Sequence, residues 1–164
     1  MPPPIVRVLV VEDERDVAAL LHDALIDLGY TVCLAEDGAA ALAIVPVFRP
    51  DVVLLDLAMP EMPGEVVLER LREADPALPV IIVTGNPDIE SARTTLAQGA
   101  FDYVAKPFDL ERLAHVLAAA IVSGLSATPR DAQSRAVLAL RTFRRACRRR
   151  SGRGACSGGR GRSP

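Results

Sequence analysis

Polar residues at the ends of apolar runs are the side chains of this sequence best suited to chemistry. Each run has the length and composition of a buried strand, and each ends in a residue that can bind or react. These residues are Glu12, Asp13, Asp56, Thr84 and Lys106. Because open parallel sheets bind ligands outside the carboxyl ends of their strands, we expect these side chains to lie together. Three carboxylates, a hydroxyl and an ammonium group can together hold a hard cation and accept a phosphoryl group.

Two other classes of site do not fit these residues. A dinucleotide-binding turn needs glycines after the first strand, whereas this turn is the acidic sequence Glu12-Asp13-Glu14. A phosphatase of the haloacid-dehalogenase type pairs its nucleophile with an aspartate two residues later, and the residue at that place after Asp56 is Ala58. A cation site remains, in which Asp13 and Asp56 supply oxygens to Mg²⁺ and Glu12 reaches the ion through water.

The elements that must position these residues alternate between strand and helix patterns. Strands are expected at 5–11, 31–35, 51–56, 79–84 and 101–105. Helices are expected at 14–28, 38–45, 65–75, 87–98 and 110–122. Pro46 is expected to end or kink the second helix, while Gly29 and Gly99 fit the left-handed position after a helix. Five strand–helix units with strands buried on both faces predict a three-layer α/β fold around a parallel sheet.

The strand ends also carry four motifs that resemble the signatures of the response-regulator receiver domain. The motifs are Val10-Val11-Glu12-Asp13-Glu14, Leu54-Leu55-Asp56-Leu57-Ala58-Met59-Pro60, Val83-Thr84-Gly85 and Tyr103-Val104-Ala105-Lys106-Pro107-Phe108. Their order and spacing match that family across residues 5–122. The resemblance implies a flavodoxin-like (βα)5 fold, a three-layer sandwich whose parallel five-stranded sheet has the strand order 2-1-3-4-5.

This resemblance gives the acidic residues specific roles. It implies that Asp56 is phosphorylated, taking a phosphoryl group from the phosphohistidine of a sensor histidine kinase or a phosphotransfer protein. It implies that Mg²⁺ is held by Glu12, Asp13, Asp56 and the carbonyl group of Ala58. The peptide bond that joins Lys106 to Pro107 should be cis by the same comparison, an arrangement that is common only before proline.

The remaining motif residues are implied to form a switch. Thr84 and Lys106 would bind the phosphoryl group and, with Asp56, catalyse only the protein's own phosphotransfer and autodephosphorylation. Tyr103 would turn from exposed to buried and so change the face made by the fourth helix, fifth strand and fifth helix. We expect a downstream protein, or a second copy after phosphorylation, to bind that face. The resemblance thus implies a signalling module and not a metabolic enzyme.

Charge divides the chain into two parts. Residues 1–123 carry 8 Lys or Arg and 20 Asp or Glu, whereas residues 124–164 carry 11 Arg and one Asp. We expect a receiver domain at 1–123 and a basic tail at 124–164, partly a short helix and partly disordered. Apolar residues at helical spacing would share one face of that short helix, and these are Ala136, Leu140, Phe143 and Cys147.

Three roles remain open for the basic tail. It can bind nucleic acid through phosphate charge, bind an anionic membrane surface or partner helix, or be a solvated extension that docks loosely on the acidic domain. The alternative function is therefore a DNA-binding transcription regulator that acts through this tail or through a truncated output domain. No apolar stretch approaches the roughly 20 residues that span a bilayer. Three cysteines without a CxxC pattern fit a reducing cytoplasm, where we expect the protein to act.

Overall fold

The sheet has five parallel strands, and the computed structural model describes it within residues 5–85 and 89–124 of the chain. The strands are β1 (Arg7–Val11), β2 (Thr31–Ala35), β3 (Val52–Leu55), β4 (Val80–Thr84) and β5 (Asp102–Ala105). They are arranged in the order β2-β1-β3-β4-β5, which confirms the predicted strand order. Expectations for the basic tail and for the beginning of the fourth helix lie outside the described residues.

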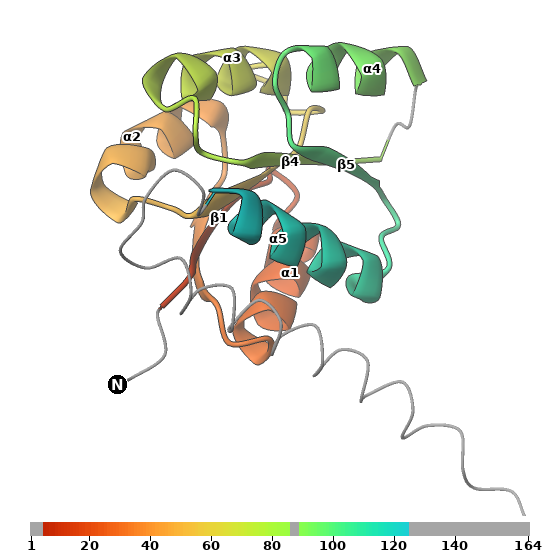
Figure 1. The fold of residues 1–164 in the computed structure, drawn as a ribbon. Helices are drawn as coiled ribbons and strands as arrows, with labels where there is room; N and C mark the ends of the chain where they lie inside the picture. The colour runs from red at the N-terminus through yellow and green to blue at the C-terminus, as the bar shows by residue number, and fades with distance from the viewer. Residues whose placement is uncertain (1–4, 86–88, 125–164) are drawn as a thin grey trace, which may run out of the picture.

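Five helices cover the two faces of this sheet. They are α1 (Arg15–Asp27), α2 (Gly38–Phe48), α3 (Gly64–Ala74), α4 (Ile89–Ala97) and α5 (Leu110–Gly124). Figure 1 shows α3 and α4 above the sheet and α1 and α5 below it, with α2 beside α3 at the left. This arrangement is the three-layer α/β sandwich that the alternation of strand and helix patterns predicts.

Alternate residues of the strands face the two helical layers. Val8 and Val10 of β1 belong to the core that α1 and α5 cover, whereas Leu9 and Val11 belong to the core that α2 and α3 cover. Both cores consist mainly of aliphatic side chains. Because each strand is buried on both faces, it appears in the sequence as a continuous apolar run.

One local expectation is wrong: α2 does not end before Pro46. The helix includes Pro46 and continues to Phe48, and Arg49 then takes a left-handed conformation with φ of 51°. Phe48 packs against the core under α2 and α3, and its carbonyl accepts a hydrogen bond from the Arg7 side chain at 3.0 Å. The Arg49 N–H donates to the Val45 carbonyl at 2.9 Å. These contacts hold the last turn of the helix in place although Pro46 cannot donate a hydrogen bond to the preceding turn.

Other backbone expectations are confirmed. Gly29 and Gly99 follow α1 and α4 with φ of 92° and 100°, in the region that favours glycine. The peptide bond between Lys106 and Pro107 is cis. Within the described residues, none of the helices combines the length and the apolar character that crossing a membrane requires.

Candidate site at the carboxyl edge of the sheet

Glu12 and Asp56 lie side by side because β1 and β3 are parallel neighbours in register. Val11 pairs with Leu55, so the next residue of each strand lies just beyond the carboxyl edge of the sheet. The Asp56 N–H donates to the Val11 carbonyl at 3.0 Å, which fixes the two chain segments relative to each other. Both acidic side chains are buried, with only 3% of each residue exposed.

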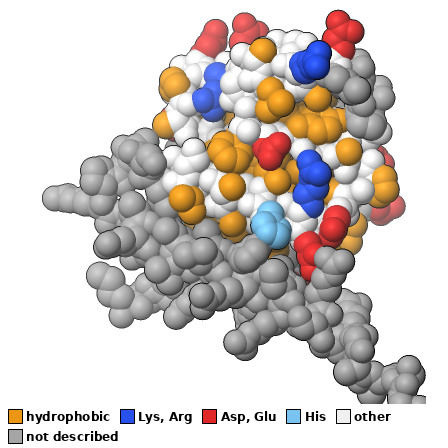
Figure 2. All heavy atoms as spheres, turned by 45° about the vertical axis from the view of Figure 1, so that its right-hand side comes forward, with side chains coloured by type: hydrophobic (Ala, Val, Ile, Leu, Met, Phe, Trp, Pro, Cys, Tyr) orange, Lys and Arg blue, Asp and Glu red, His pale blue; other side chains and the backbone are white. Residues whose placement is uncertain are grey.

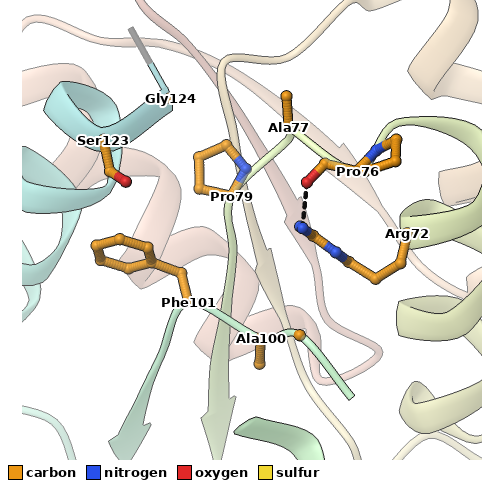
Figure 3. Close-up of a pocket in the computed structure, with 9 residues that line it drawn as sticks. Arg72, Pro76, Ala77, Pro79, Ala100, Phe101, Ser123 and Gly124 are labelled. Atoms are coloured by element: carbon orange, nitrogen blue, oxygen red, sulfur yellow. Dashed lines mark hydrogen bonds between the residues drawn. The ribbon is translucent and has the colours of Figure 1, made fainter. Parts of the chain in front are cut away.

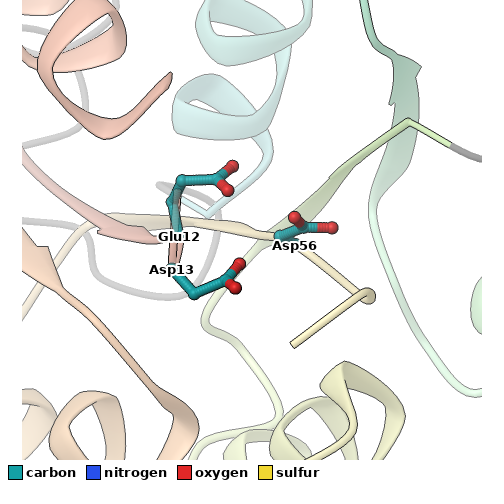
Figure 4. Close-up of side chains that lie close together, drawn as sticks. All are labelled: Glu12, Asp13 and Asp56. Atoms are coloured by element: carbon teal, nitrogen blue, oxygen red, sulfur yellow. The ribbon is translucent and has the colours of Figure 1, made fainter. Parts of the chain in front are cut away.

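Asp13 completes an acidic cluster with these two residues. Carboxylate oxygens of Glu12, Asp13 and Asp56 lie within 4.8 Å of one another. Figure 4 shows the three carboxylates, two from the end of β1 and one from the end of β3, turned toward a common space. Oδ1 of Asp13 is buried and has no hydrogen-bond partner in the described part of the chain. This donor set fits a hard cation, since such ions take carboxylate oxygens and an unpaired buried oxygen needs a partner.

Lys106 places its ammonium group between two of these carboxylates. Nζ lies 2.9 Å from Oδ2 of Asp56 and 2.7 Å from Oε2 of Glu12, and the lysine side chain is only 12% exposed. Oε1 of Glu14 lies 3.6 Å from the same nitrogen, on a side chain that is mostly exposed. A buried ammonium group shared by two buried carboxylates offsets part of their desolvation and mutual repulsion.

The environment changes the proton affinity of both charged partners. Burial raises the pKa of Glu12 to about 6, and the charge of Asp56 adds to this, although the hydrogen bond and charge of Lys106 oppose it. Burial alone would lower the pKa of Lys106, but its hydrogen bonds and charge interactions with Glu12 and Asp56 outweigh burial and raise it. Lys106 is therefore charged at neutral pH, whereas ionised Glu12 costs the folded state some stability.

Backbone groups around Asp56 hold its carboxylate in place. The Ala58 N–H donates to Oδ1 of Asp56 at 3.0 Å, and Ala58 itself is exposed beside the site. Gly64 packs directly against this loop: a Cβ added there would lie 2.5 Å from the Asp56 carbonyl oxygen and 2.6 Å from Leu57 Cα. Sequence reasoning missed both contributions, because neither a backbone N–H nor a close backbone approach leaves a chemical signature in residue type.

Thr84 and Lys106 come from neighbouring strands that bring them to the same edge. Thr84 is the last residue of β4, is buried, and pairs with Ala105 of β5. The Lys106 N–H donates to the Thr84 carbonyl at 2.8 Å. Tyr103 pairs with Ile82, is half-buried, and packs against the core under α2 and α3. The predicted residues from Glu12 to Lys106 thus lie at or near one edge of the sheet, and Tyr103 is the one farthest from that edge.

A hollow at the opposite edge of the sheet has a different character. This cavity of about 530 Å³ lies near the beginnings of β4 and β5. Figure 3 shows Arg72 pointing toward the Pro76 carbonyl, to which its guanidinium donates a hydrogen bond. The same guanidinium donates to the Leu78 carbonyl at 2.6 Å. Because Arg72 already has these backbone partners, its position is explained by support of the loop before β4.

The face made by α4, β5 and α5 is partly apolar. Figure 2 turns this side of the molecule forward and shows hydrophobic side chains gathered in the middle, with separated acidic and basic side chains among and around them. Leu96 of α4 and Leu110 of α5 are exposed. Exposed apolar side chains on one face are typical of surfaces that contact other proteins.

This fold, with acids following β1 and β3 and a lysine following β5, defines a class of signalling domain. The sequence profile of the response regulator receiver domain matches residues 8–118, and the chain belongs to that family. Among solved structures, a receiver domain protein from Methanospirillum hungatei is similar with a TM-score of 0.72 and 25% identity, covering 76% of this chain and 99% of the other. The receiver domain of a LuxO repressor protein from Vibrio parahaemolyticus has a TM-score of 0.70 and 30% identity, covering 74% and 93%.

Curated relatives are longer proteins. The regulatory protein AtoC of Escherichia coli is 42% identical over 107 residues, which are 65% of this chain and 23% of AtoC. The probable transcriptional regulatory protein TcrX of Mycobacterium tuberculosis is 42% identical over 108 residues, covering 66% of this chain and 46% of TcrX. The matched region thus spans about a quarter to a half of these relatives, so the likeness concerns their receiver part.

Proposed function

We propose that this receiver accepts a phosphoryl group on Asp56 from a sensor histidine kinase or a phosphotransfer protein. The observation that carries this proposal is the placement of Asp56 Oδ2, which lies 2.9 Å from Lys106 Nζ and beside two further carboxylates. An aspartate so placed can act as a nucleophile, because the lysine offsets negative charge as the phosphoryl group approaches.

Mg²⁺ is the cation we assign to the acidic cluster. Its protein ligands would be the carboxylates of Glu12, Asp13 and Asp56 together with the Ala58 carbonyl. The bound ion would neutralise charge between these carboxylates and the phosphoryl oxygens. Glu12 and Asp13 orient the site from the end of β1, while the Ala58 N–H keeps Asp56 directed toward it.

A switch follows from the charge that phosphorylation adds. A phosphoryl group brings about −1.5 to −2 charges and three strong acceptor oxygens. Lys106 and the Thr84 hydroxyl are the nearby donors we assign to those oxygens, so both loops would draw inward. Tyr103 would then turn into the space near Thr84 and change the face of α4, β5 and α5. That face would bind a downstream protein or a second copy of the chain.

A second candidate output is DNA binding. It is favoured by the relatives, which include a DNA-binding transcriptional regulator NtrC of Escherichia coli that is 39% identical over 114 residues, 24% of its own length. Output would then lie in the basic segment 124–164 or in a domain attached to the receiver of residues 1–123. We infer that the protein acts in the cytoplasm, and the absence of a CxxC pattern among its three cysteines supports this.

Intact-protein mass after incubation with acetyl phosphate and Mg²⁺ tests the phosphoacceptor. We expect one phosphoryl adduct on the wild type, dependent on Mg²⁺ and labile in base, and none on Asp56→Asn. Asp23→Asn, which changes an exposed acid of α1, is the matched control and should be labelled like the wild type. An adduct that survives in Asp56→Asn at the wild-type level would assign the phosphoacceptor to another residue.

A further inference from the structure

Helix α2 has no polar side chain. Its eleven residues are Gly, Ala, Leu, Ile, Val, Pro and Phe only, although the helix lies on the surface of the domain. A surface helix normally has a polar face, and a helix that is apolar on all sides is normally buried. Only Gly38 and Ala41 of α2 are buried here. Five further residues of α2 are half-buried against the core under α2 and α3, and the remaining four form an exposed apolar side.

The uncovered side of α2 is a continuous stripe. Ala39, Ala43, Pro46 and Val47 are exposed and recur at helical spacing, and half-buried Leu42 lies beside them. Val47 is 84% exposed, more than any other large hydrophobic side chain of the described residues. Figure 1 shows α2 at the margin of the molecule beside α3, with α4 on the far side of α3, so this stripe is separate from the face assigned above to partners.

Charge argues against a second receiver as the cover. Residues 1–123 carry 20 acidic and 8 basic side chains, so a second receiver brings little complementary charge to α2. Glu36 and Asp37 lie at the amino end of α2, where a partner of opposite charge would be attracted. The segment 124–164 of the same chain has that charge, with 11 Arg and one Asp.

The basic segment also has a matching apolar pattern. Its apolar residues Ala136, Leu140, Phe143 and Cys147 are spaced by four, three and four residues, as on one side of a helix. Arg141, Arg144 and Arg145 lie between these residues, and Arg148, Arg149 and Arg150 follow them. A helix of this kind would place its apolar side on α2 and could bring its arginines toward Glu36 and Asp37 at the amino end of α2.

The chain is long enough to bring this segment to α2. Gly124 lies beside Pro79, which precedes β4, and the carbonyl of Phe48 is bonded to Arg7 at the beginning of β1. The carboxyl-terminal ends of α5 and α2 are thus both at the amino edge of the sheet. At that edge β1 and β4 are two strand spacings, or about 10 Å, apart. The twelve residues from Gly124 to Ala136 can span up to about 40 Å when extended.

We propose that the apolar stripe of α2 is the docking site of the chain's own segment 136–147. This docking is independent of phosphorylation of Asp56 and goes beyond the function proposed above. Docking would hold the basic segment against the receiver domain. An anionic ligand of the segment's arginines would then have to compete with Glu36 and Asp37 for them.

The fluorescence of a tryptophan at position 47 measures whether the stripe on α2 is covered or exposed to solvent. The signal comes from this residue alone, because the full chain contains no tryptophan. In full-length Val47→Trp we expect blue-shifted emission and acrylamide quenching about threefold weaker than for Ala19→Trp, an exposed position on α1. Adding Leu140→Glu should restore exposed emission. Adding Thr142→Glu, which makes the same charge change off the apolar stripe, should leave the emission blue-shifted.

Other outcomes would overturn the proposal. Exposed emission in every variant would show that the stripe is open to solvent. Blue-shifted emission that depends on protein concentration and ignores Leu140→Glu would show that a second copy covers α2. Hydrogen exchange of the α2 amides in the chain with native Val47 provides a check without the reporter: exchange should be faster in Leu140→Glu than in Thr142→Glu, and equal rates would contradict docking.

Discussion

Replacement of Glu12 by glutamine should stabilise the protein at neutral pH in the absence of divalent cations. Glutamine keeps the size of the side chain but only one acceptor oxygen, so it can replace either the contact of Lys106 with Oε2 or that of the Glu14 N–H with Oε1. It removes a negative charge that is buried beside Asp56. Because burial and the neighbouring carboxylate raise the pKa of Glu12, the ionised form is the one that the fold disfavours.

The size of the effect follows from the pKa. Glu12 has a pKa of about 6 when folded and an ordinary value of 4.5. At about 1.4 kcal/mol per pH unit, ionised Glu12 costs the folded state about 2 kcal/mol. Protonated Glu12 does not carry this cost, so the wild type is free of it below pH 4.5 and acquires it as the pH rises through 6. Between pH 4.5 and pH 7.5 the stability of Glu12→Gln relative to the wild type should therefore rise by about 2 kcal/mol.

Thermal unfolding in EDTA measures this difference. An unfolding entropy of about 2.1 cal/mol/K per residue over roughly 120 folded residues gives about 0.25 kcal/mol/K, so 2 kcal/mol corresponds to about 8 °C in Tm. Glu14→Gln is the matched control, since its side chain is mostly exposed and 3.6 Å from Lys106. We expect that control to shift the free energy of unfolding by less than about 0.5 kcal/mol.

Two results would refute this reasoning. If Glu12→Gln lowers Tm at pH 7.5, the ion pair with Lys106 stabilises the fold by more than burial of the carboxylate costs. If the variant is stabilised equally at pH 4.5 and 7.5, the gain comes from packing and not from ionisation. Mg²⁺ should reduce the difference in Tm between Glu12→Gln and the wild type at pH 7.5. A bound cation interacts more favourably with the carboxylate of the wild type than with a neutral amide, so it stabilises the wild type more.

Three further substitutions test the surroundings of Asp56. Lys106→Met should lower the free energy of unfolding by about 3 kcal/mol in urea titrations, because two buried carboxylates lose the ammonium group between them. The double variant with Asp56→Asn should recover part of this lost stability, because one of the two buried charges is then removed. Gly64→Ala should cost about 3 kcal/mol and slow phosphoryl uptake, since its Cβ would overlap the Asp56 backbone; wild-type values of both would contradict the close approach. Ala58→Asn should leave the decay rate of the phosphorylated protein within about threefold of wild type, and a tenfold acceleration would show that this position controls lifetime.

The sequence predicts the fold and the acidic cluster for the same physical reason. Strands buried on both faces are apolar throughout, so the first polar residue after each run marks the edge of the sheet. Glu12 and Asp56 are such residues, and the parallel register of β1 and β3 makes them neighbours. Lys106 follows the same rule at the end of β5. Residue type and position in the sequence were therefore enough to predict that Glu12, Asp56 and Lys106 lie together.

Features that depend on the path of a loop could not be read in this way. Gly64 looks like any turn glycine in the sequence, yet its missing Cβ lets α3 begin against the Asp56 backbone. Glu14 appears in the sequence only as part of an acidic turn, and in the structure its carboxylate lies 3.6 Å from the Lys106 ammonium group. Pro46 predicts an early helix end, but the packing of Phe48 at the last turn outweighs one lost hydrogen bond. Tertiary contacts decide each of these cases.

The charge balance of the cluster explains why phosphoryl uptake should require a divalent cation. Glu12, Asp13 and Asp56 would carry three negative charges when ionised, and Lys106 offsets one of them through the two carboxylates that it touches. The two remaining negative charges equal the charge of one divalent ion, and the unpaired Asp13 oxygen lies where such an ion would be bound. Phosphoryl donors are themselves anions, and these two charges would repel them at short range in a buried site. We therefore expect uptake by Asp56 to fail in EDTA even though Lys106 and the nucleophile are already in contact.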